Sequence, residues 1–331
     1  MEKLNDIKVF LEQLRDPSQG KTFKELNAIK AVTLEDDVCF IKLALSNRKR
    51  DEDTIKLSIV KYVKITMGIA GIRVEFEDLP VLKEPSKIKY LAIASGKGGV
   101  GKSSVTANLA YALSALGKKV GIIDADLYGA SQPSIFKLPV GPLETDKDDM
   151  LIPTEKMGIQ IISTEFFMPE NQPLMWRGPM LSKLLVHFFE GVMWDPEITY
   201  ILIDLPPGTG DVTLDVQEFM PEAKVIVVTT PHPNAAHVAI KAGLGAKEIG
   251  HDVIGVIENM SYYFDATTKN KLEIFGAGGG LDVSQKLNVD LLAKLPIEPV
   301  IANEETYLYK NNQMNGKLYQ ALALKIIELM K

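Results

Sequence analysis

Cysteine is almost absent from this 331-residue sequence, which contains only Cys39. A single thiol excludes an internal disulfide framework and is typical of a protein from a reducing compartment. No uninterrupted apolar run approaches the ~20 residues that a membrane span requires. The first six residues, MEKLND, lack the basic and then apolar character of a signal peptide. These absences predict a cytoplasmic protein without a membrane span.

Positively charged residues are slightly outnumbered by negatively charged ones. Lys and Arg together number 37 against 43 Asp and Glu, so the formal net charge is −6. This balance indicates no general attraction to nucleic acid or anionic lipid, although it is compatible with a local basic patch. The four histidines show no metal-ligand spacing. The sequence also lacks a Gly-x-Ser-x-Gly elbow and a Cys–His pair, so nothing in it indicates a covalent nucleophile.

The most informative feature that is present is a glycine-rich loop, GKGGVGKSS, over residues 96–104. An apolar run precedes it and an apolar-periodic segment follows, so the local order is strand, loop, helix. The loop fits Gly-x-x-x-x-Gly-Lys-Ser/Thr, whose backbone N–H groups cradle phosphate oxygens at the positive end of the helix dipole. Lys102 would reach the β- and γ-phosphates, and Ser103 would bind Mg²⁺. The predicted nucleotide-binding residues of the loop are Gly96, Lys97, Gly98, Gly99, Val100, Gly101, Lys102, Ser103 and Ser104.

The same glycines also satisfy Gly-x-Gly-x-x-Gly, the fingerprint of dinucleotide-binding sites. Asp124 or Asp126 would then be the acidic residue that this fingerprint requires ~20 positions later. Two features favour a triphosphate instead: Lys102 and Ser103 directly follow the third glycine of the fingerprint, and a further metal-side carboxylate lies downstream. A plain strand-to-helix turn explains one or two glycines, but not four followed by a lysine.

Two strands that end in carboxylates supply the remaining parts of the predicted site. The segment VGIIDAD ends in Asp124 and Asp126, whose side chains point the same way while the strand lasts. One carboxylate would hold the helix or metal shell and the other would orient water. The alternative interpretation is that the two Asp residues only initiate a turn. The segment YILIDLPPGTGD presents Asp204 after four apolar residues, as a metal-side carboxylate is presented in phosphate-loop proteins. The PPGTG that follows can change conformation with the γ-phosphate.

Apolar strands alternate with amphipathic helices from residue 88 onward. Strands are expected at 89–94, 120–124, 159–163, 200–204, 224–229, 253–258 and 291–296, and helices at 105–116, 179–189, 212–219, 234–249 and 316–330. Because near-continuous apolar strands are buried on both faces, we predict a mainly parallel, doubly wound α/β sheet. The glycine run at 276–280 is expected to be a flexible loop.

The first part of the chain is predicted to form a separate domain. Residues 1–80 indicate a small α/β unit, with helices near 4–14 and 53–67 and strands at 29–34, 38–45 and 72–76. Residues 81–87 are polar and proline-bearing, and are interpreted as a linker. Residues 88–331 then form the P-loop ATPase domain.

Five motifs in chain order resemble the Mrp/ApbC family of P-loop ATPases, which are related to MinD, ParA and the nitrogenase iron protein. They are the deviant Walker A loop with Lys97, IDADLYG at 123–129, WRGP at 176–179, DLPPGTGD at 204–211 and ENMSY at 258–262. The resemblance runs from about residue 87 to the C-terminus. The first 80 residues resemble the small N-terminal domain that many bacterial Mrp proteins carry.

The resemblance implies a homodimer that sandwiches and hydrolyses ATP, with slow basal turnover because the site is completed only by dimer closure and partner contact. Lys97 matches the signature lysine that crosses to the partner's nucleotide, and Lys102 and Ser103 match the phosphate and Mg²⁺ ligands. Asp126 matches the switch I residue that positions water, Asp204 the switch II carboxylate, and Asn259 a position that reads adenine.

Members of this family are iron–sulfur cluster carriers, and the resemblance places a Cys-x-x-Cys for a bridging cluster after the ENMSY motif. This sequence has DATT at 265–268 instead, and EIFG at 273–276 resumes in register. Clusters normally need four thiolates, and the chain has only Cys39, inside a predicted strand. The resemblance therefore supports the ATPase but not the cluster site.

Three functions remain open from the sequence. The first is an ATP-hydrolysing protein of iron–sulfur cluster handling, with an apoprotein or a pathway protein as its partner. The second is an ATP-dependent regulatory dimer of the cysteine-lacking SalA type, which binds DNA or protein, although the net charge does not support DNA. The third is a MinD-like organiser at a membrane surface. The thin cationic face of the C-terminal segment 318–331 indicates a packing helix rather than a membrane-binding one.

Overall fold

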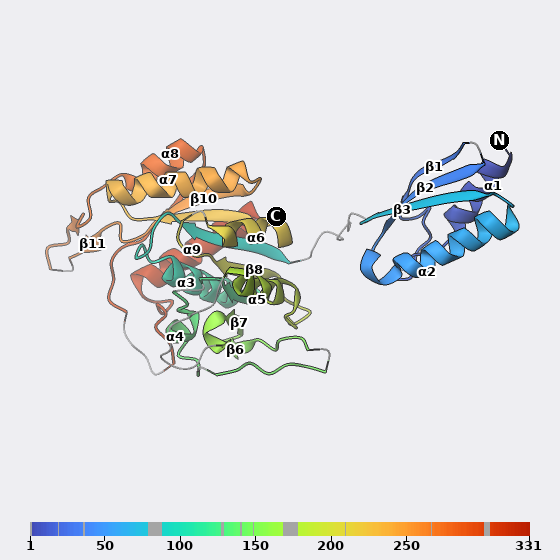
Figure 1. Ribbon diagram of the computed structural model, residues 1–331. Coiled ribbons are helices and arrows are strands. Elements are labelled where there is room, and N and C mark those ends of the chain that lie inside the picture. Colours follow the sequence, from blue (N-terminus) through green and yellow to red (C-terminus); the bar gives the residue numbers. More distant parts are fainter. Residues whose placement is uncertain are drawn as a thin grey trace. The chain divides into compact units, whose positions relative to one another are not determined.

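The computed structural model describes residues 2–18, 20–35, 37–78, 88–126, 129–139, 141–147, 149–167, 178–208, 210–265, 267–300 and 305–331. The chain divides into two compact units, Met1–Ser86 and Lys87–Lys331 (Figure 1). The predicted linker at 81–87 lies outside the described residues. Parts of the predicted motifs also lie outside them, namely residues 127–128, 176–177 and 209.

The N-terminal unit is a three-stranded sheet with helices. Its elements are α1 (Glu2–Gln13), β1 (Ile29–Glu35), β2 (Val38–Leu45), α2 (Arg48–Lys61), the π-helical turn η1 (Tyr62–Thr66) and β3 (Gly71–Asp78). β2 is central, antiparallel to β1 and parallel to β3. The second helix begins at Arg48, before the predicted start at 53, because the Asn47 side chain accepts a hydrogen bond from the N–H of Arg50.

The C-terminal unit contains an eight-stranded sheet within the described residues, in the order β13-β10-β9-β4-β8-β5-β7-β6. Its strands are β4 (Lys89–Ser95), β5 (Val120–Asp124), β6 (Thr154–Lys156), β7 (Ile159–Ser163), β8 (Tyr200–Asp204), β9 (Lys224–Thr229), β10 (Asp252–Glu258) and β13 (Leu291–Lys294). All neighbours pair in parallel except β6, which is antiparallel to β7. The prediction of a mainly parallel α/β sheet is confirmed.

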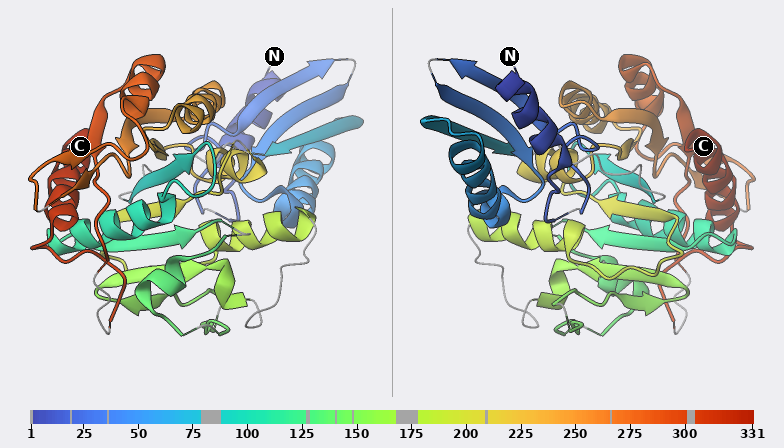
Figure 2. Two further views of the ribbon diagram at one scale, coloured as in Figure 1. Left: turned by 90° about the vertical axis from the view of Figure 1, so that its left-hand side faces the viewer. Right: turned by 90° about the vertical axis from the view of Figure 1, so that its right-hand side faces the viewer.

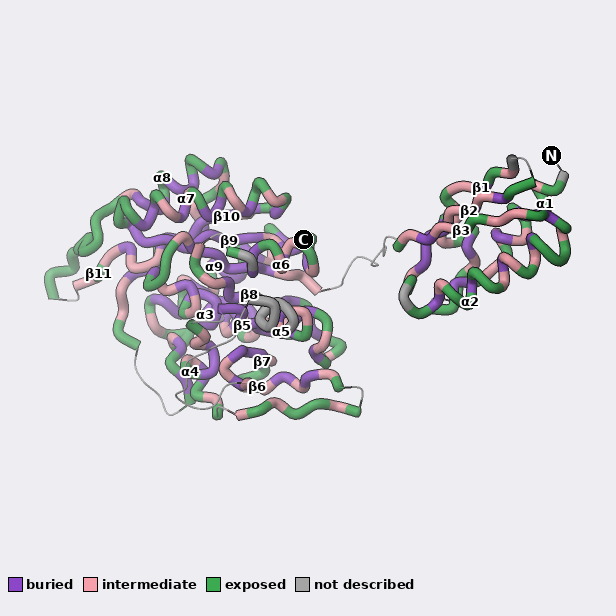
Figure 3. The backbone as a smooth tube through the Cα atoms, viewed as in Figure 1, coloured by how far each residue is buried: buried purple, intermediate pink, exposed green. Residues whose placement is uncertain are grey.

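Helices cover both faces of this sheet (Figure 1 and Figure 2). They are α3 (Lys102–Ala115), α4 (Gln132–Phe136), α5 (Gly178–Glu190), α6 (Asp211–Phe219), α7 (Pro233–Glu248), α8 (Gly279–Leu287) and α9 (Met314–Leu329), with a short 3₁₀ turn η2 (Thr164–Phe167). Alternate residues of β4 face two cores: Leu91 and Ile93 pack with α3 and α9, whereas Ala92 and Ala94 pack with α5, α6 and α7. The central strands are accordingly buried along most of their length, whereas β6 at the edge of the sheet is partly exposed (Figure 3).

The C-terminal helix is part of the first of these cores. Tyr319, Leu322 and Ile326 of α9 are buried with side chains of α3. Lys224 Nζ donates to the Leu329 carbonyl and fixes the end of the helix. This packing agrees with the interpretation of 318–331 as a packing helix. None of the described helices is both long and apolar enough to span a bilayer.

The prediction of a flexible loop over 276–280 is wrong for its last two residues, since Gly279 and Gly280 begin α8. A Cβ at Gly279 would overlap with the Pro231 carbonyl, and one at Gly280 would lie 2.6 Å from Cβ of Glu258. Close packing therefore requires these glycines. The N–H of Gly280 donates to the Glu258 carboxylate at 2.6 Å, so a protein anion already occupies the start of this helix.

Candidate nucleotide-binding site

The glycine-rich loop joins β4 to α3 at the carboxyl edge of the sheet. Gly99 and Gly101 have φ of +80° and +83°, in the left-handed region that favours glycine. Gly96 is required for a different reason, because a Cβ there would overlap with the backbone of Val238 in α7. The loop can therefore take this path only with glycine at these positions, and its path exposes backbone N–H groups at the start of a helix.

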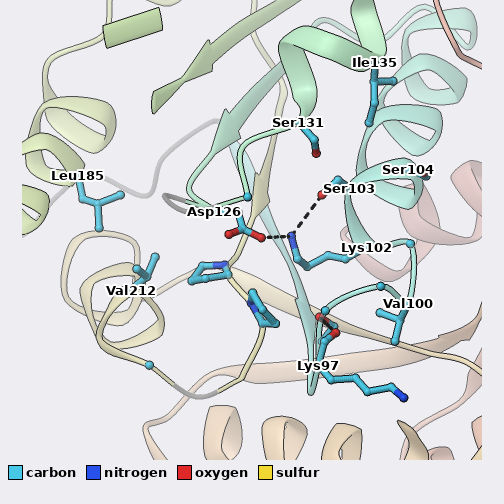
Figure 4. A pocket seen from close by; sticks show the side chains of 18 of the residues that line it. Lys97, Val100, Lys102, Ser103, Ser104, Asp126, Ser131, Ile135, Leu185 and Val212 are labelled. Carbon is cyan, nitrogen blue, oxygen red and sulfur yellow. Dashed lines mark hydrogen bonds and ion pairs between the residues drawn. The ribbon is translucent and has the colours of Figure 1, made fainter. Parts of the chain in front are cut away.

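A cavity of about 870 Å³ opens beside this loop, which is a size typical of ligand sites (Figure 4). Residues 97–104 line it on one side, and Leu185 of α5 and Val212 of α6 face it from the other. Other lining residues follow the ends of β5 and β8: Asp126, Gly129, Ser131, Ile135, Pro206, Pro207, Gly210 and Asp215. Asp126, Gly129 and the PPGTG segment belong to motifs identified from the sequence, whereas Ser131, Ile135 and Asp215 were not predicted as site residues.

Lys102 brings three predicted residues together next to this cavity. Its Nζ lies 2.5 Å from Oδ1 of Asp204, 3.3 Å from Oδ2 of Asp126 and 3.4 Å from Oγ of Ser103. Lys102 is only 6% exposed and Asp204 is fully buried. One cation thus faces two carboxylates, one at the end of β8 and one just after β5. Both lie in surroundings where water screens charge little.

The sheet order explains this convergence. β4, which carries the loop, is next to β8, and β8 is next to β5. The parallel register pairs Asp204 of β8 directly with Asp124 of β5, so both carboxylates arrive at the same edge. Ligand sites of open α/β sheets lie at this edge, where chain connections leave in opposite directions. Connections leave in opposite directions at this point of the sheet, because β5 and β9 lie on opposite sides of β4.

Asp124 and Asp126 have different surroundings, because the strand ends at Asp124 and the alternation of side chains stops there. Asp126 faces the cavity, whereas Asp124 is fully buried. Oδ2 of Asp124 accepts the N–H groups of Ser131 and Gln132 and the hydroxyl of Ser163, all at 3.0–3.1 Å. Burial, together with the nearby Asp204 charge, raises the pKa of Asp124 to about 7. Asp124 thus holds the start of α4 against the end of β5.

Gln132 is a functional candidate that the sequence analysis missed. It is fully buried at the start of α4, and its Nε2 donates to Oδ2 of Asp204 at 2.9 Å. The only sequence signal was Pro133, which is typical of a first helical turn. That signal marks the helix but does not show where the glutamine side chain lies.

Lys97 differs from Lys102 in its exposure and in its contacts. It is exposed, and among the described residues its ammonium group has no hydrogen-bond or ion-pair partner. Figure 4 shows it extending away from Asp126 and Lys102. It lines a second, smaller cavity of about 280 Å³ together with His232, Met260 and Phe275.

Asn259 contacts the loop rather than the main cavity. Its Nδ2 donates to the Val100 carbonyl at 2.9 Å, and a Cβ at Gly101 would overlap with this amide. The N–H of Asn259 donates to the Thr229 carbonyl at the end of β9. Asn259 therefore braces the loop against the neighbouring strand, and its role as an adenine reader stays a prediction.

Asp265, Thr267 and Thr268, in place of the expected Cys-x-x-Cys, lie between two short strands, β11 (Tyr263–Phe264) and β12 (Lys271–Leu272). Asp265 accepts the N–H of Thr267 at 2.8 Å and the hydroxyl of Thr268 at 2.7 Å. The Thr268 hydroxyl, as the largest of these contributions, lowers the pKa of Asp265. The side chains at 265 and 268 thus satisfy one another.

An iron–sulfur cluster does not fit the thiols that this chain offers. Cys39 is fully buried in β2 of the N-terminal unit, and burial raises the pKa of its thiol, which disfavours the thiolate that a cluster needs. The described ranges also contain no group of three or more His, Cys, Asp and Glu side chains that could hold a metal. By contrast, the Ser103 hydroxyl and the Asp204 carboxylate are oxygen donors of the kind that Mg²⁺ prefers.

Comparisons with known proteins agree with this site. A family model named ParA and described as "NUBPL iron-transfer P-loop NTPase" matches residues 87–327. A Bacillus subtilis protein named iron-sulfur cluster carrier protein is 41% identical over 344 residues, which cover 97% of each chain. A protein of the same name from Aquifex aeolicus is 42% identical over 223 residues, covering 67% of this chain and 61% of that relative.

Solved structures share the fold of the C-terminal unit. A nucleotide-binding protein from Archaeoglobus fulgidus, in complex with ADP, is 32% identical with a TM-score of 0.55, covering 72% of this chain and 88% of that one. The cell division ATPase MinD from Pyrococcus furiosus has a TM-score of 0.51 at 23% identity, covering 73% and 99%. The predicted P-loop ATPase is confirmed by these matches, and the chain belongs to the NUBPL iron-transfer P-loop NTPase family.

Proposed function

We propose that this protein is a homodimeric Mrp-type ATPase that binds Mg²⁺–ATP in the cavity beside the loop and acts in iron–sulfur cluster handling without holding a cluster on its own thiols. The observation that carries the proposal is the convergence of Lys102, Asp204 and Asp126 beside the loop. The names of the relatives from Bacillus subtilis and Aquifex aeolicus support the iron–sulfur part.

Each residue of the site has a distinct role in this proposal. The N–H groups between Lys97 and Ser104 hold the phosphates, and Lys102 exchanges its carboxylate partners for phosphate oxygens. Ser103 and Asp204 hold Mg²⁺, directly or through water, and the ion would neutralise charge on the phosphates. Asp126, at the cavity wall, orients the attacking water.

The homodimer is supported by the surface around Lys97. This lysine is an exposed cation of the nucleotide loop itself and has no partner among the described residues. Large apolar side chains are exposed in β12 and the segment that follows it: Leu272, Ile274 and Phe275. Phe275 shares the smaller cavity with Lys97. A second copy would cover these side chains and receive Lys97 at its own nucleotide.

Phosphate release from Mg²⁺–ATP tests the proposal. The wild-type protein is expected to hydrolyse ATP slowly, and Lys102→Ala is expected to be inactive because the loop loses its phosphate cation. Sedimentation with and without ATP tests the dimer. Near-wild-type turnover in the folded Lys102→Ala variant would overturn the site assignment.

An ATP-dependent regulatory dimer is the second candidate, and one observation favours it. Asp265, Thr267 and Thr268 are held by hydrogen bonds among themselves and offer no thiol. Anaerobic reconstitution with iron and sulfide separates the candidates. Bound iron and acid-labile sulfide would contradict the absence of a cluster. Retention of DNA that requires ATP and weakens with salt would favour the regulatory dimer.

A further inference from the structure

Gln132 is a buried amide that joins three parts of the nucleotide site. It is fully buried and is not among the residues that line the main cavity. Its Nε2 donates to Oδ2 of Asp204 at 2.9 Å and to the carbonyl of Ser103 at 3.1 Å. Its own N–H donates to Asp124 at 3.1 Å. The end of β8, the start of α3 and the end of β5 are therefore connected through one residue.

The orientation of this amide is fixed by chemistry. Both groups that the side chain contacts, a carboxylate and a carbonyl, can only accept hydrogen bonds, so the NH₂ group must face them. The oxygen Oε1 is then buried with no donor among the described residues. An unsatisfied buried acceptor is costly, and it persists here because both amide protons go to Asp204 and Ser103.

The two oxygens of Asp204 are consequently held by different groups. Oδ1 accepts from Lys102 and, at 3.4 Å, from the hydroxyl of Thr106. Oδ2 accepts from Gln132. With a donor on each oxygen, the carboxylate cannot rotate without losing a hydrogen bond. Lys102 and Gln132 together set its plane, and Gln132 does so without lining the cavity.

We propose that Gln132 is a positioning residue for ATP hydrolysis, which orients the Asp204 carboxylate toward Lys102 and the metal and ties it to the Ser103 turn. This inference rests on the proposed function, since it deepens the role of the same site. Gln132 touches no nucleotide in this account and acts only through Asp204 and Ser103. Its loss should change what depends on Asp204 and leave the phosphate cradle intact.

Gln132→Met tests this role, because methionine has a similar length but no donor. We expect kcat to fall about 10- to 100-fold, as when a residue that orients a metal ligand is removed. ADP binding without Mg²⁺ is expected to stay within about twofold of wild type, because the loop N–H groups are unchanged. The additional rise in melting temperature that Mg²⁺ gives to the ADP-bound wild type should be largely lost.

Phe136→Leu is the matched control, because Phe136 is fully buried on the same short helix and belongs to the apolar core. It should lower the melting temperature without changing the Mg²⁺ effect. Gln132→Glu is a second variant of similar size that places a carboxylate against Asp204, and it should lose at least as much kcat as the methionine variant. If the methionine variant fails to fold, the glutamate variant and Gln132→Asn are measured in the same way.

The outcomes separate this inference from the proposed function. If wild type does not hydrolyse ATP, or Lys102→Ala is fully active, the proposed function fails. If wild type is active, Lys102→Ala is inactive and Gln132→Met keeps wild-type kcat and the wild-type Mg²⁺ effect, only the role of Gln132 is wrong. Equal changes in Gln132→Met and Phe136→Leu would likewise reduce Gln132 to a packing residue.

Discussion

The ammonium of Lys102 lies 2.5 Å from Oδ1 of Asp204, so the first residue of α3 is paired with the last residue of β8. The pair is almost completely shielded from water. Removing one member of such a pair is costly because it leaves a buried charge with fewer partners. Here Asp126 remains as a second partner for the lysine, 3.3 Å away.

Asp204→Asn is expected to uncouple nucleotide binding from hydrolysis. Asparagine can still accept from Lys102, so we expect a loss of folding stability of only about 1–3 kcal/mol. Turnover should fall about 100-fold or more, because a charge that acts on the phosphates and metal is lost. ADP binding without Mg²⁺ should persist, as measured by calorimetry. Wild-type turnover in this variant would contradict the role given to Asp204.

Lys97→Ala is expected to keep nucleotide binding and lose turnover. The side chain is exposed, so the melting temperature should not change. Turnover should fall on the order of 100-fold, since a cation supplied across an interface to phosphoryl transfer is worth at least that much. Lys118→Ala is the control, because Lys118 precedes β5 at the opposite edge of the sheet. A Lys97→Ala protein whose turnover per site matches wild type at every concentration would exclude the cross-interface role.

The sequence predicted seven strands of the eight-stranded sheet, because these are short, mostly apolar runs. It missed β6, whose three residues are polar and lie at the edge of the sheet. It predicted the loop and Lys102 because a phosphate cradle requires those residue types at that spacing. The roles of Asp124 and Asp126 could not be separated, because the argument from alternation holds only inside a strand and the strand ends at Asp124. The predicted strand, 120–124, ends where β5 does, but the residues themselves do not show where a side chain beyond that end lies.

Gln132 shows a different limit. The helix α4 has five residues, too few for a periodic pattern, and the partners of Gln132 lie 29 and 72 residues away along the chain. Only the folded sheet brings them together. Gly279 and Gly280 were misread for the same reason, because the backbone of Pro231 and the side chain of Glu258 that demand glycine are distant in sequence.

Asp124→Asn is expected to stabilise the folded protein in a pH-dependent manner. The folded state holds this carboxyl neutral up to about pH 7, whereas in the unfolded chain it ionises near its ordinary value of about 4. Its stabilising contribution is therefore fully present below about pH 4 and is lost as the pH rises through 7. The free energy of unfolding of the variant should rise relative to that of wild type by roughly 1.4 kcal/mol per pH unit between pH 4 and 7.

Urea unfolding of both proteins at pH 5, 6, 7 and 8, without nucleotide, measures this difference. Titrating groups that do not interact with Asp124 are common to both proteins and cancel. The gap should widen up to about pH 7 and then level off. A gap that is constant with pH would show that Asp124 is ionised in the folded state across this range.

Gly101→Ala and Gly98→Ala form a matched pair within the loop. Gly101 has φ of +83°, and a Cβ there would overlap with the Asn259 amide that braces Val100. At Gly98 a Cβ would meet no atom within 4 Å, and φ is not in the left-handed region. We expect Gly101→Ala to lose roughly 1–3 kcal/mol of folding stability, from strain and from the displaced amide. Gly98→Ala should stay within about 1 kcal/mol of wild type or gain slightly, because alanine restricts the unfolded chain.

The Asn259→Ala variant separates the two causes of the loss at Gly101. If the overlap with the amide matters, the Gly101→Ala, Asn259→Ala double variant should lose less than the sum of the single losses, because the alanine at 101 then meets no amide. If only backbone strain matters, the losses should add. Urea unfolding of the four proteins gives this coupling directly. ADP binding by Gly101→Ala, Asn259→Ala and the double variant tests whether the brace that Asn259 gives the loop preserves the phosphate cradle, in which case these variants bind ADP more weakly than wild type.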